Sequence, residues 1–506
     1  MIPAPSRPVL REQLRQTRGS ISRRQFLQTT SATAAALSLA GCMGGDDETA
    51  PATDGNETNS SDDGSETDGD PPSGVPDSFD DRDALRQRSR EFVQLLADGQ
   101  FETAGEWVDP DAPIPFGATE LERAWTGVVG SGAEIDSIDR VVYFGTVRGN
   151  NRYNLDVTVD GDQYQVVVDY SAHGVITFQI VPVQEWTPPE YADRDSFVEE
   201  EVGLETPLDC ELGATVSLPD TDETVPGVVI VHGNGPTDRD NTVGPNRTYT
   251  EIAWGLASQG IAVLRYDKRT YACQPDLADA TIDDIVTEDA LTAISELRSF
   301  EEVADDRLFV AGHSFGGGLA PRIARMDGNL AGTVMLAPGP AGPFSDLIER
   351  QARHLFDLQP VDSSLREEFL QGVEREAEKI RNLEIGDDEV VRFGGREFYR
   401  SLQNYDQTGT AAELEIPQLL IQGGQDFQLT VEDDLPIWRD ALEGKENVEI
   451  TVYDDLNHLF QESQGERTQA EYALDNEVDK RVIDRIATFV ENEIREESDG
   501  VRTVLA

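Results

Sequence analysis

Lysine is nearly absent from this chain of 506 residues: only four of its 41 basic residues are lysine, against 98 acidic residues and a net charge of −57. Such an excess of negative charge argues against nucleic acid as a partner. No His, Cys and carboxylate spacing typical of a metal site occurs, and no organic-cofactor motif is found, so neither a metal nor a cofactor is expected. The apolar stretch 28–39 is too short to span a bilayer as a stable helix.

The acidity is not confined to one tail. Residues 1–41 carry +5 and residues 42–78 hold 11 acids and no base, which leaves −51 on residues 79–506. Acid in excess with so little lysine resembles proteins of extreme halophiles, in which about 1 M salt or more reduces the screening length to roughly 3 Å and relieves self-repulsion. A chain of this length is also expected to form two domains with tails.

The N-terminus carries two targeting motifs in succession. Arg23 and Arg24, within Ser-Arg-Arg-Gln-Phe-Leu, look like a twin-arginine export signal. The run Leu-Ala-Gly-Cys that ends at Cys42 resembles a lipobox, after which the signal is cut and the cysteine carries lipid. We therefore expect a signal over residues 1–41, a disordered acidic tether over 42–78, and a mature protein anchored by lipid to the extracellular face of the cell membrane.

Residues 79–187 predict a small α+β domain. Two helix-periodic stretches precede four alternating or apolar runs, expected as strands over 135–147, 153–159, 164–170 and 175–183. Asp160-Gly161-Asp162 and His173-Gly174 read as hairpin turns. Helices followed by an antiparallel meander resemble the nuclear-transport-factor-like cone. This segment carries no convincing chemistry of its own.

Residues 188–500 alternate strand and helix patterns, as an α/β domain requires. Most expected strands are Val, Ile and Leu runs typical of a parallel sheet covered on both faces; they span 208–218, 227–231, 261–266, 308–311, 332–337, 418–422 and 448–453. Expected helices are 249–258, 282–300, 316–326, 431–442 and 477–496. This order resembles the α/β-hydrolase fold with a mostly parallel sheet. A long insertion, about 339–415, has three helix-like stretches and is expected to form a cap.

The run Gly312-His-Ser314-Phe-Gly316 follows the apolar stretch 308–311 and opens into a helix-like segment. It resembles the nucleophile elbow, in which a strained turn lifts the serine hydroxyl clear of the sheet and glycines remove colliding side chains. The resemblance implies Ser314 as the nucleophile of a serine hydrolase in the dienelactone-hydrolase and serine-aminopeptidase-like branch.

A serine hydroxyl needs an imidazole to take its proton and a carboxylate to orient that imidazole. Elimination among the five histidines selects His458, because His173 lies in the other domain, His354 in the cap, and His232 and His313 in loops where a structural role is expected. The acid should follow the serine in sequence at a strand end, which favours Asp426. Asp454 and Asp455 are the competing acids, and Asp267 is expected to form a structural ion pair.

The stretch Val228 to Pro236 ends in His-Gly-Asn-Gly-Pro. Acyl transfer requires two backbone N–H groups aimed at the developing oxyanion. The family resemblance implies the N–H of Asn234 for one of them and that of Phe315 for the other.

Cys210 and Cys273 remain outside the signal. A disulfide between them is possible outside the membrane, but a twin-arginine substrate normally folds in a reducing compartment, which favours two separate buried thiols.

Together these patterns predict a membrane-anchored serine hydrolase that cleaves carboxylic esters through an acyl-enzyme, with a small-molecule ester and water as substrates. Two alternatives stay open: an aminopeptidase-like amide hydrolase, and a non-catalytic surface lipoprotein that uses the scaffold for binding.

Overall fold

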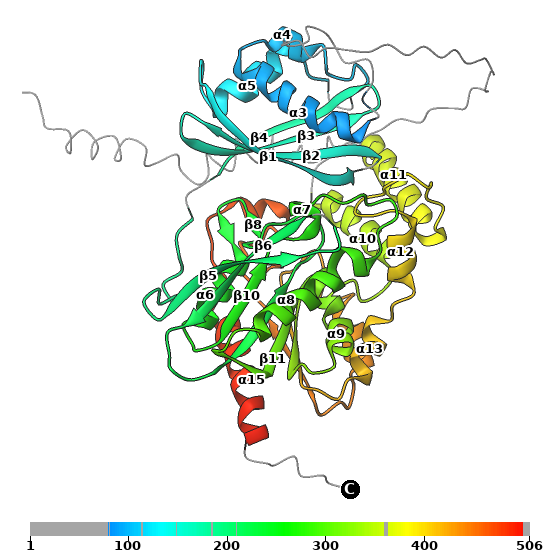
Figure 1. Ribbon diagram of the computed structural model, residues 1–506. Helices are drawn as coiled ribbons and strands as arrows, with labels where there is room; N and C mark the ends of the chain where they lie inside the picture. Colours follow the sequence, from blue (N-terminus) through cyan, green and yellow to red (C-terminus); the bar gives the residue numbers. More distant parts are fainter. Residues whose placement is uncertain are drawn as a thin grey trace, which may run out of the picture.

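The computed structural model describes residues 79, 81–112, 115–147, 149–183, 186–208, 210–358 and 363–498. The expected signal (1–41), its lipidation residue Cys42 and the tether (42–78) lie outside these ranges. Two folded units are stacked, the smaller N-terminal unit on one end of the larger one, and helix α15 lies at the opposite end (Figure 1).

The smaller unit is a four-stranded antiparallel sheet in the order β1-β2-β3-β4, with its helices on the face turned away from the larger unit (Figure 1). Its elements are α3 (Arg82–Ala97), α4 (Phe101–Gly105), α5 (Ala118–Val128), β1 (Ile135–Val147), β2 (Asn150–Val159), β3 (Asp162–Ser171) and β4 (Gly174–Pro182). Both expected hairpin turns join neighbouring strands of this sheet, and Asp160 and Gly161 both take positive φ, as a tight turn requires.

The larger unit is built on an eight-stranded sheet in the order β14-β13-β12-β11-β7-β10-β6-β5. Along this order all neighbouring strands from β14 to β10 are parallel, and the two remaining pairs, β10 with β6 and β6 with β5, are antiparallel. The strands are β5 (Phe197–Glu205), β6 (Glu211–Pro219), β7 (Val225–Val231), β10 (Ala262–Tyr266), β11 (Val303–His313), β12 (Gly332–Leu336), β13 (Gln418–Gly423) and β14 (Val448–Tyr453), with a small ribbon of β8 (Thr242–Val243) and β9 (Asn246–Arg247).

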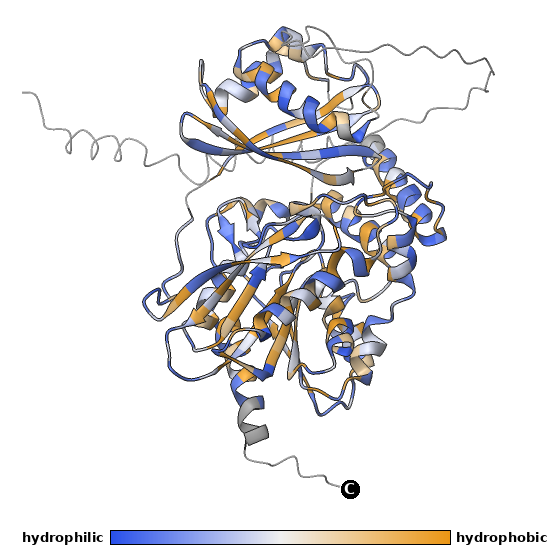
Figure 2. Ribbon diagram, in the orientation of Figure 1, coloured by the Kyte–Doolittle hydropathy of each residue, from blue (hydrophilic) through white to orange (hydrophobic). Residues whose placement is uncertain are grey.

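Both faces of this sheet are covered, which explains its continuous apolar runs. In β7, Val229 and Val231 join the hydrophobic core on one face, and Val228 and Ile230 join the core on the other. Hydropathic colouring shows the apolar residues concentrated in the strands (Figure 2). The predicted α/β-hydrolase topology with a mostly parallel sheet is therefore confirmed.

Helices pack on the two faces and fill the insertion between β12 and β13. They are α6 (Thr248–Ala257), α7 (Arg269–Ala272), α8 (Glu288–Arg298), α9 (Phe315–Asp327), α14 (Leu435–Ala441) and α15 (Lys480–Ser498), and in the insertion α10 (Phe344–Asp357), α11 (Ser363–Asn382), α12 (Arg396–Gln403) and α13 (Gln407–Glu413). A π-helical turn (Asp283–Thr287) precedes α8, and a 3-10 turn spans Gln469–Ala473. None of the helices in the described part of the chain has the length and apolar character needed to cross a membrane.

Strand β5 was missing from the sequence-based expectation. It lies at the edge of the sheet, and its sequence FVEEEVGLE contains three consecutive glutamates and a fourth at its end, all exposed or half-buried. Charge on an edge strand protects it from pairing with other chains, but it also hides the apolar signal of a strand.

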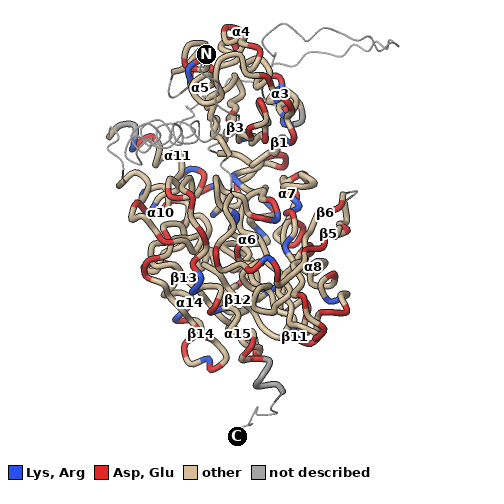
Figure 3. Tube along the Cα trace, turned by 90° about the vertical axis from the view of Figure 1, so that its left-hand side faces the viewer, with Lys and Arg blue, Asp and Glu red and all other residues tan. Residues whose placement is uncertain are grey.

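Acidic residues are spread over both units (Figure 3).

Candidate active site

Ser314 occupies the sharp turn between β11 and α9. Its backbone angles, φ 56° and ψ −118°, lie in a strained region for a residue with a side chain. A Cβ on Gly312 would lie 2.1 Å from the carbonyl oxygen of Gly316, and a Cβ on Gly316 would lie 2.5 Å from that of His232. Both flanking positions therefore accept only glycine, and the turn is fixed by close backbone packing.

His458 and Asp426 meet in the loops that follow β14 and β13. Nδ1 of His458 lies 2.7 Å from Oδ2 of Asp426, and both side chains are buried. The other carboxylate oxygen accepts the backbone N–H groups of Gln428 and Leu429, at 2.8 and 3.0 Å. The carboxylate accepts the hydrogen bond that Nδ1–H donates, and Nε2 is the ring nitrogen left to take a proton.

The competing acids Asp454 and Asp455 are exposed, whereas Asp426 is fully buried. The Asp455 carboxylate pairs with Arg481 at 2.7 Å on the surface, and this hydrogen bond lowers the pKa of Asp455. Asp454 receives the Gln425 side-chain amide on its backbone carbonyl. Asp267 pairs with Arg239 at 3.1 Å, as expected of a structural ion pair.

His313, next to Ser314, belongs to a buried hydrogen-bond chain. Its Nε2 lies 2.9 Å from the carbonyl oxygen of His458, which can only accept, so Nε2–H donates. Burial, followed by the proximity of His458, lowers the pKa of His313 to about 3, so the ring is neutral and Nδ1 accepts from the Tyr249 hydroxyl at 3.1 Å. The N–H of Gly233 in turn donates to the Tyr249 oxygen at 3.2 Å.

The sequence does not single out Tyr249 as a site residue. It is one apolar-face residue of helix α6, and no local pattern marks its hydroxyl as the link between the loops after β7, β11 and β14.

The loop after β7 lies against the serine turn. A Cβ on Gly233 would lie 3.1 Å from the Cβ of Ser314. The buried ammonium of Lys268 donates to the Gly233 carbonyl oxygen at 2.6 Å, and burial lowers the pKa of Lys268 to about 7. Asn234 and Phe315 line one narrow cavity of about 20 Å³ beside this loop.

His232 anchors the start of the same loop. Its Nε2–H donates to the carbonyl oxygen of Tyr266, and its Nδ1 accepts from the Thr237 hydroxyl at 2.8 Å. Burial lowers the pKa of His232 to about 3, so the ring is neutral and both of its nitrogens are occupied.

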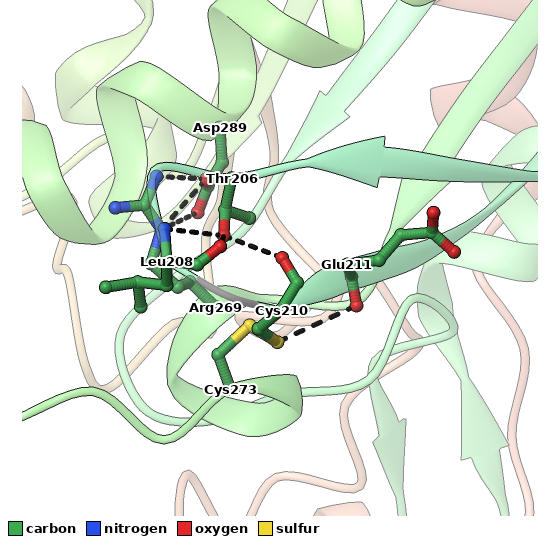
Figure 4. The surroundings of a disulfide bond; sticks show 7 residues. All are labelled: Thr206, Leu208, Cys210, Glu211, Arg269, Cys273 and Asp289. Carbon is green, nitrogen blue, oxygen red and sulfur yellow. Dashed lines mark hydrogen bonds and ion pairs between the residues drawn. A yellow bond between two sulfur atoms is a disulfide. The ribbon is translucent and has the colours of Figure 1, made fainter.

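Cys210 and Cys273 form a disulfide, with Cα atoms 5.8 Å apart, so the expectation of two separate thiols is wrong (Figure 4). The pairing of β6 with β10 explains why they meet. Ala214 of β6 lies opposite Tyr266 of β10, Cys210 immediately precedes β6, and Cys273 caps the short helix α7 that follows β10. A signal for this contact exists only in the sheet register, which the sequence does not show.

Comparison with known proteins agrees with this architecture. Residues 228–471 match the alpha/beta hydrolase family model. The chain is 34% identical over 413 residues to esterase EstD of Thermotoga maritima, an alignment that covers 80% of this chain and 95% of the relative. The chain belongs to the alpha/beta hydrolase family.

Solved structures with a related fold include an esterase of Pyrococcus furiosus and the acylaminoacyl peptidase of Pyrococcus horikoshii. The first is 17% identical to this hydrolase and covers 61% of it and 98% of its own chain, with a TM-score of 0.38. The second is 14% identical, and its match covers 70% of this chain and 56% of its own chain, with a TM-score of 0.40. The family assignment rests on the Thermotoga relative and on the sheet topology.

The export signal is also found by comparison. Residues 20–40 of the hydrolase match the model of the twin-arginine translocation signal. The hydrolase is therefore exported across the cytoplasmic membrane.

Proposed function

We propose that this protein is a carboxylic ester hydrolase that works through an acyl-enzyme formed on Ser314. The observation that carries the proposal is the buried 2.7 Å contact between Nδ1 of His458 and Oδ2 of Asp426. The bond from His313 to the His458 carbonyl ties the base loop to the residue before the nucleophile.

In the proposed reaction, Nε2 of His458 takes the Ser314 hydroxyl proton while Oγ attacks the ester carbonyl carbon. Asp426 accepts the Nδ1 proton in a hydrogen bond and stabilises the imidazolium. The backbone N–H groups of Asn234 and Phe315 bind the oxyanion of the tetrahedral intermediate. The ester C–O bond then breaks, and His458 returns the proton to the leaving alcohol.

Water completes the cycle. His458 removes a proton from water, the hydroxide attacks the acyl carbon, and the carboxylic acid leaves as the Ser314 oxygen regains its proton. The esterase name of the Thermotoga relative supports an ester, rather than an amide, as the bond that is cleaved.

Labelling by a fluorophosphonate probe tests the nucleophile. Wild-type protein should be labelled and Ser314→Ala should not, whereas an unlabelled, correctly folded wild type would favour the binding-protein alternative. Ester and amide chemistry are separated by comparing p-nitrophenyl esters with aminoacyl anilides, and cleavage of the anilides alone would contradict ester hydrolysis.

We further propose that lipid on Cys42 holds the mature enzyme at the outer face of the membrane, and that its acidic surface suits high salt. In the native host, Cys42→Ser should move the enzyme from the detergent phase to the aqueous phase of a detergent partition. Retention of the variant in the detergent phase would contradict the anchor.

A further inference from the structure

The smaller unit reaches the candidate site through one irregular point of its sheet. Tyr143 of β1 pairs with Tyr153 of β2, and Gly145 pairs with the next residue, Arg152, which leaves Phe144 as an extra residue in the strand. Such a β-bulge changes the direction in which its side chain points. Strand β1 lies on the side of the sheet that faces the larger unit (Figure 1).

The bulge is hydrogen-bonded to the segment between α11 and α12; we call these contacts of Thr146 with Val390 and Arg392 the latch. Thr146 donates its backbone N–H to the Arg392 carbonyl oxygen at 3.1 Å and its hydroxyl to the Val390 carbonyl oxygen at 2.9 Å. The N–H of Arg392 donates back to the Thr146 hydroxyl oxygen at 2.9 Å. Gly145 has φ +118°, and a Cβ there would lie 1.9 Å from the Arg392 oxygen, so only glycine permits this approach.

This latch places the Phe144 ring over the loop that follows β7. The ring lies edge-on to Phe393, with centroids 6.0 Å apart. A Cβ on Gly235 would lie 3.4 Å from Cε2 of Phe144. Phe144 thus lines the same narrow cavity as Asn234 and Phe315, although it belongs to a different sheet.

The cavity is lined from the side of the proposed oxyanion donors and not from the side of His458. The leaving alcohol must stay near His458, which protonates it, but no residue of the loops after β13 and β14 lines the cavity. Asn234 and Phe315, whose backbone N–H groups are the proposed oxyanion donors, do line it, and the oxygen that they would bind is carried by the first carbon of the acyl chain. At about 20 Å³ the cavity has room for little more than one water-sized group.

We propose that Phe144 determines acyl-chain specificity, closing the acyl pocket from the neighbouring unit so that the enzyme prefers short acyl groups of acetyl or propionyl size. This inference rests on the proposed ester hydrolysis and assigns one task to the smaller unit. Removing the ring leaves Gly145 and Thr146, and hence the latch, in place.

The test is kcat/KM on p-nitrophenyl acetate, butyrate and octanoate, which share one leaving group and differ only in the acyl chain. Wild type should favour acetate. Phe144→Ala should raise the octanoate-to-acetate ratio at least about 10-fold, because one methylene accommodated in an apolar pocket changes kcat/KM by roughly 10-fold or more. Phe144→Trp should lower the butyrate-to-acetate ratio, and Phe144→Leu is a milder second variant if the alanine variant fails to fold.

Phe178→Ala is the matched control, because Phe178 packs on Phe92 inside the smaller unit and does not line the cavity. Its acyl ratios should equal those of wild type. Unchanged ratios in both the alanine and leucine variants of Phe144, with Ser314-dependent hydrolysis retained, would overturn the pocket role alone. A wild type that prefers octanoate would also overturn it, whereas absence of all ester hydrolysis and labelling would overturn the proposed function as well.

Discussion

The hydroxyl oxygen of Tyr249 lies 3.1 Å from Nδ1 of His313 and also accepts the Gly233 N–H, so one phenol joins two loops of the candidate site. Through the Nε2–H of His313 the chain continues to the His458 carbonyl. Every donor in this series has one acceptor, and the neutral state of His313 fixes its direction. The network is therefore expected to position the nucleophile, the base and the oxyanion loop relative to one another.

Tyr249→Phe tests this positioning role. The variant leaves the Gly233 N–H and Nδ1 of His313 without partners, so we expect the free energy of unfolding to fall by about 1–3 kcal/mol. Misplacement of the loops should lower kcat roughly 10-fold or more with little change in KM. Urea unfolding and steady-state ester hydrolysis measure the two effects. Tyr191→Phe is the matched control, because Tyr191 packs against the same core and, within the described structure, its buried hydroxyl has no hydrogen-bond partner.

Asp426→Asn tests the orienting carboxylate. An amide cannot hold the His458 tautomer with the proton on Nδ1 as a carboxylate does, so kcat should fall about 10⁴-fold while the fold is retained. Stopped assays at high enzyme concentration can follow so slow a reaction. Asp455→Asn removes the competing acid from its surface pair with Arg481 and should keep nearly full activity. A large loss in Asp455→Asn with little loss in Asp426→Asn would reverse the assignment.

Lys268→Met should change how stability depends on pH. Burial lowers the pKa of Lys268 from 10.5 to about 7, so between these values the unfolded chain binds a proton that the native protein has released. The wild-type free energy of unfolding should therefore gain up to about 1.4 kcal/mol per pH unit from this group as pH rises above 7. Urea titrations at a series of pH values should show that the variant lacks this gain. The exposed Lys445→Met should leave the slope unchanged.

Removing the disulfide should lower stability. The bond closes a sequence separation of 63 residues, for which the chain-entropy model gives about 4 kcal/mol. Cys210→Ser with Cys273→Ser should lower the thermal midpoint, and dithiothreitol should lower that of wild type to a similar value. The reductant should not change the thermal midpoint of the double variant. If the disulfide of the wild type is reduced and its thermal midpoint does not fall, the prediction is contradicted.

Salt should stabilise this acidic protein. With a net charge of −57, self-repulsion is strong at about 0.1 M KCl and screened within roughly 3 Å above about 1 M. The thermal midpoint should rise by several degrees across this range. Sorbitol at equal osmolality, which does not screen charge, should raise it less, and an equal rise would point to a general co-solvent effect.

Much of the larger unit could be predicted because its signals are local. Parallel strands buried on both faces appear as apolar runs, and the match of β13 (Gln418–Gly423) to the expected 418–422 reflects this. The serine turn at Ser314 could also be predicted from the sequence, since the strand, the glycines and the helix that form it are contiguous in the chain.

The remaining features depend on contacts between distant segments. Cys210 meets Cys273 only through the register of β6 and β10, and Tyr249 acquires its role only when three strand ends converge. In the sequence Phe144 is one apolar residue among others in the expected strand 135–147. The bulge at Phe144 is defined by the pairing of β1 with β2 and not by composition. Sequence patterns report periodicity within an element, whereas these residues are defined by what lies opposite them.

The Thr146 latch has a consequence for protein engineering. A one-residue insertion or deletion in β1 before the bulge would reverse which side chains of the strand face the larger unit. The change would be felt at the loop after β7, which belongs to the larger unit and holds the proposed oxyanion donor Asn234. A chimera that exchanges the N-terminal unit between relatives therefore has to carry residues 141–147 and 390–393 together, because the two segments are held to each other by the hydrogen bonds of Thr146.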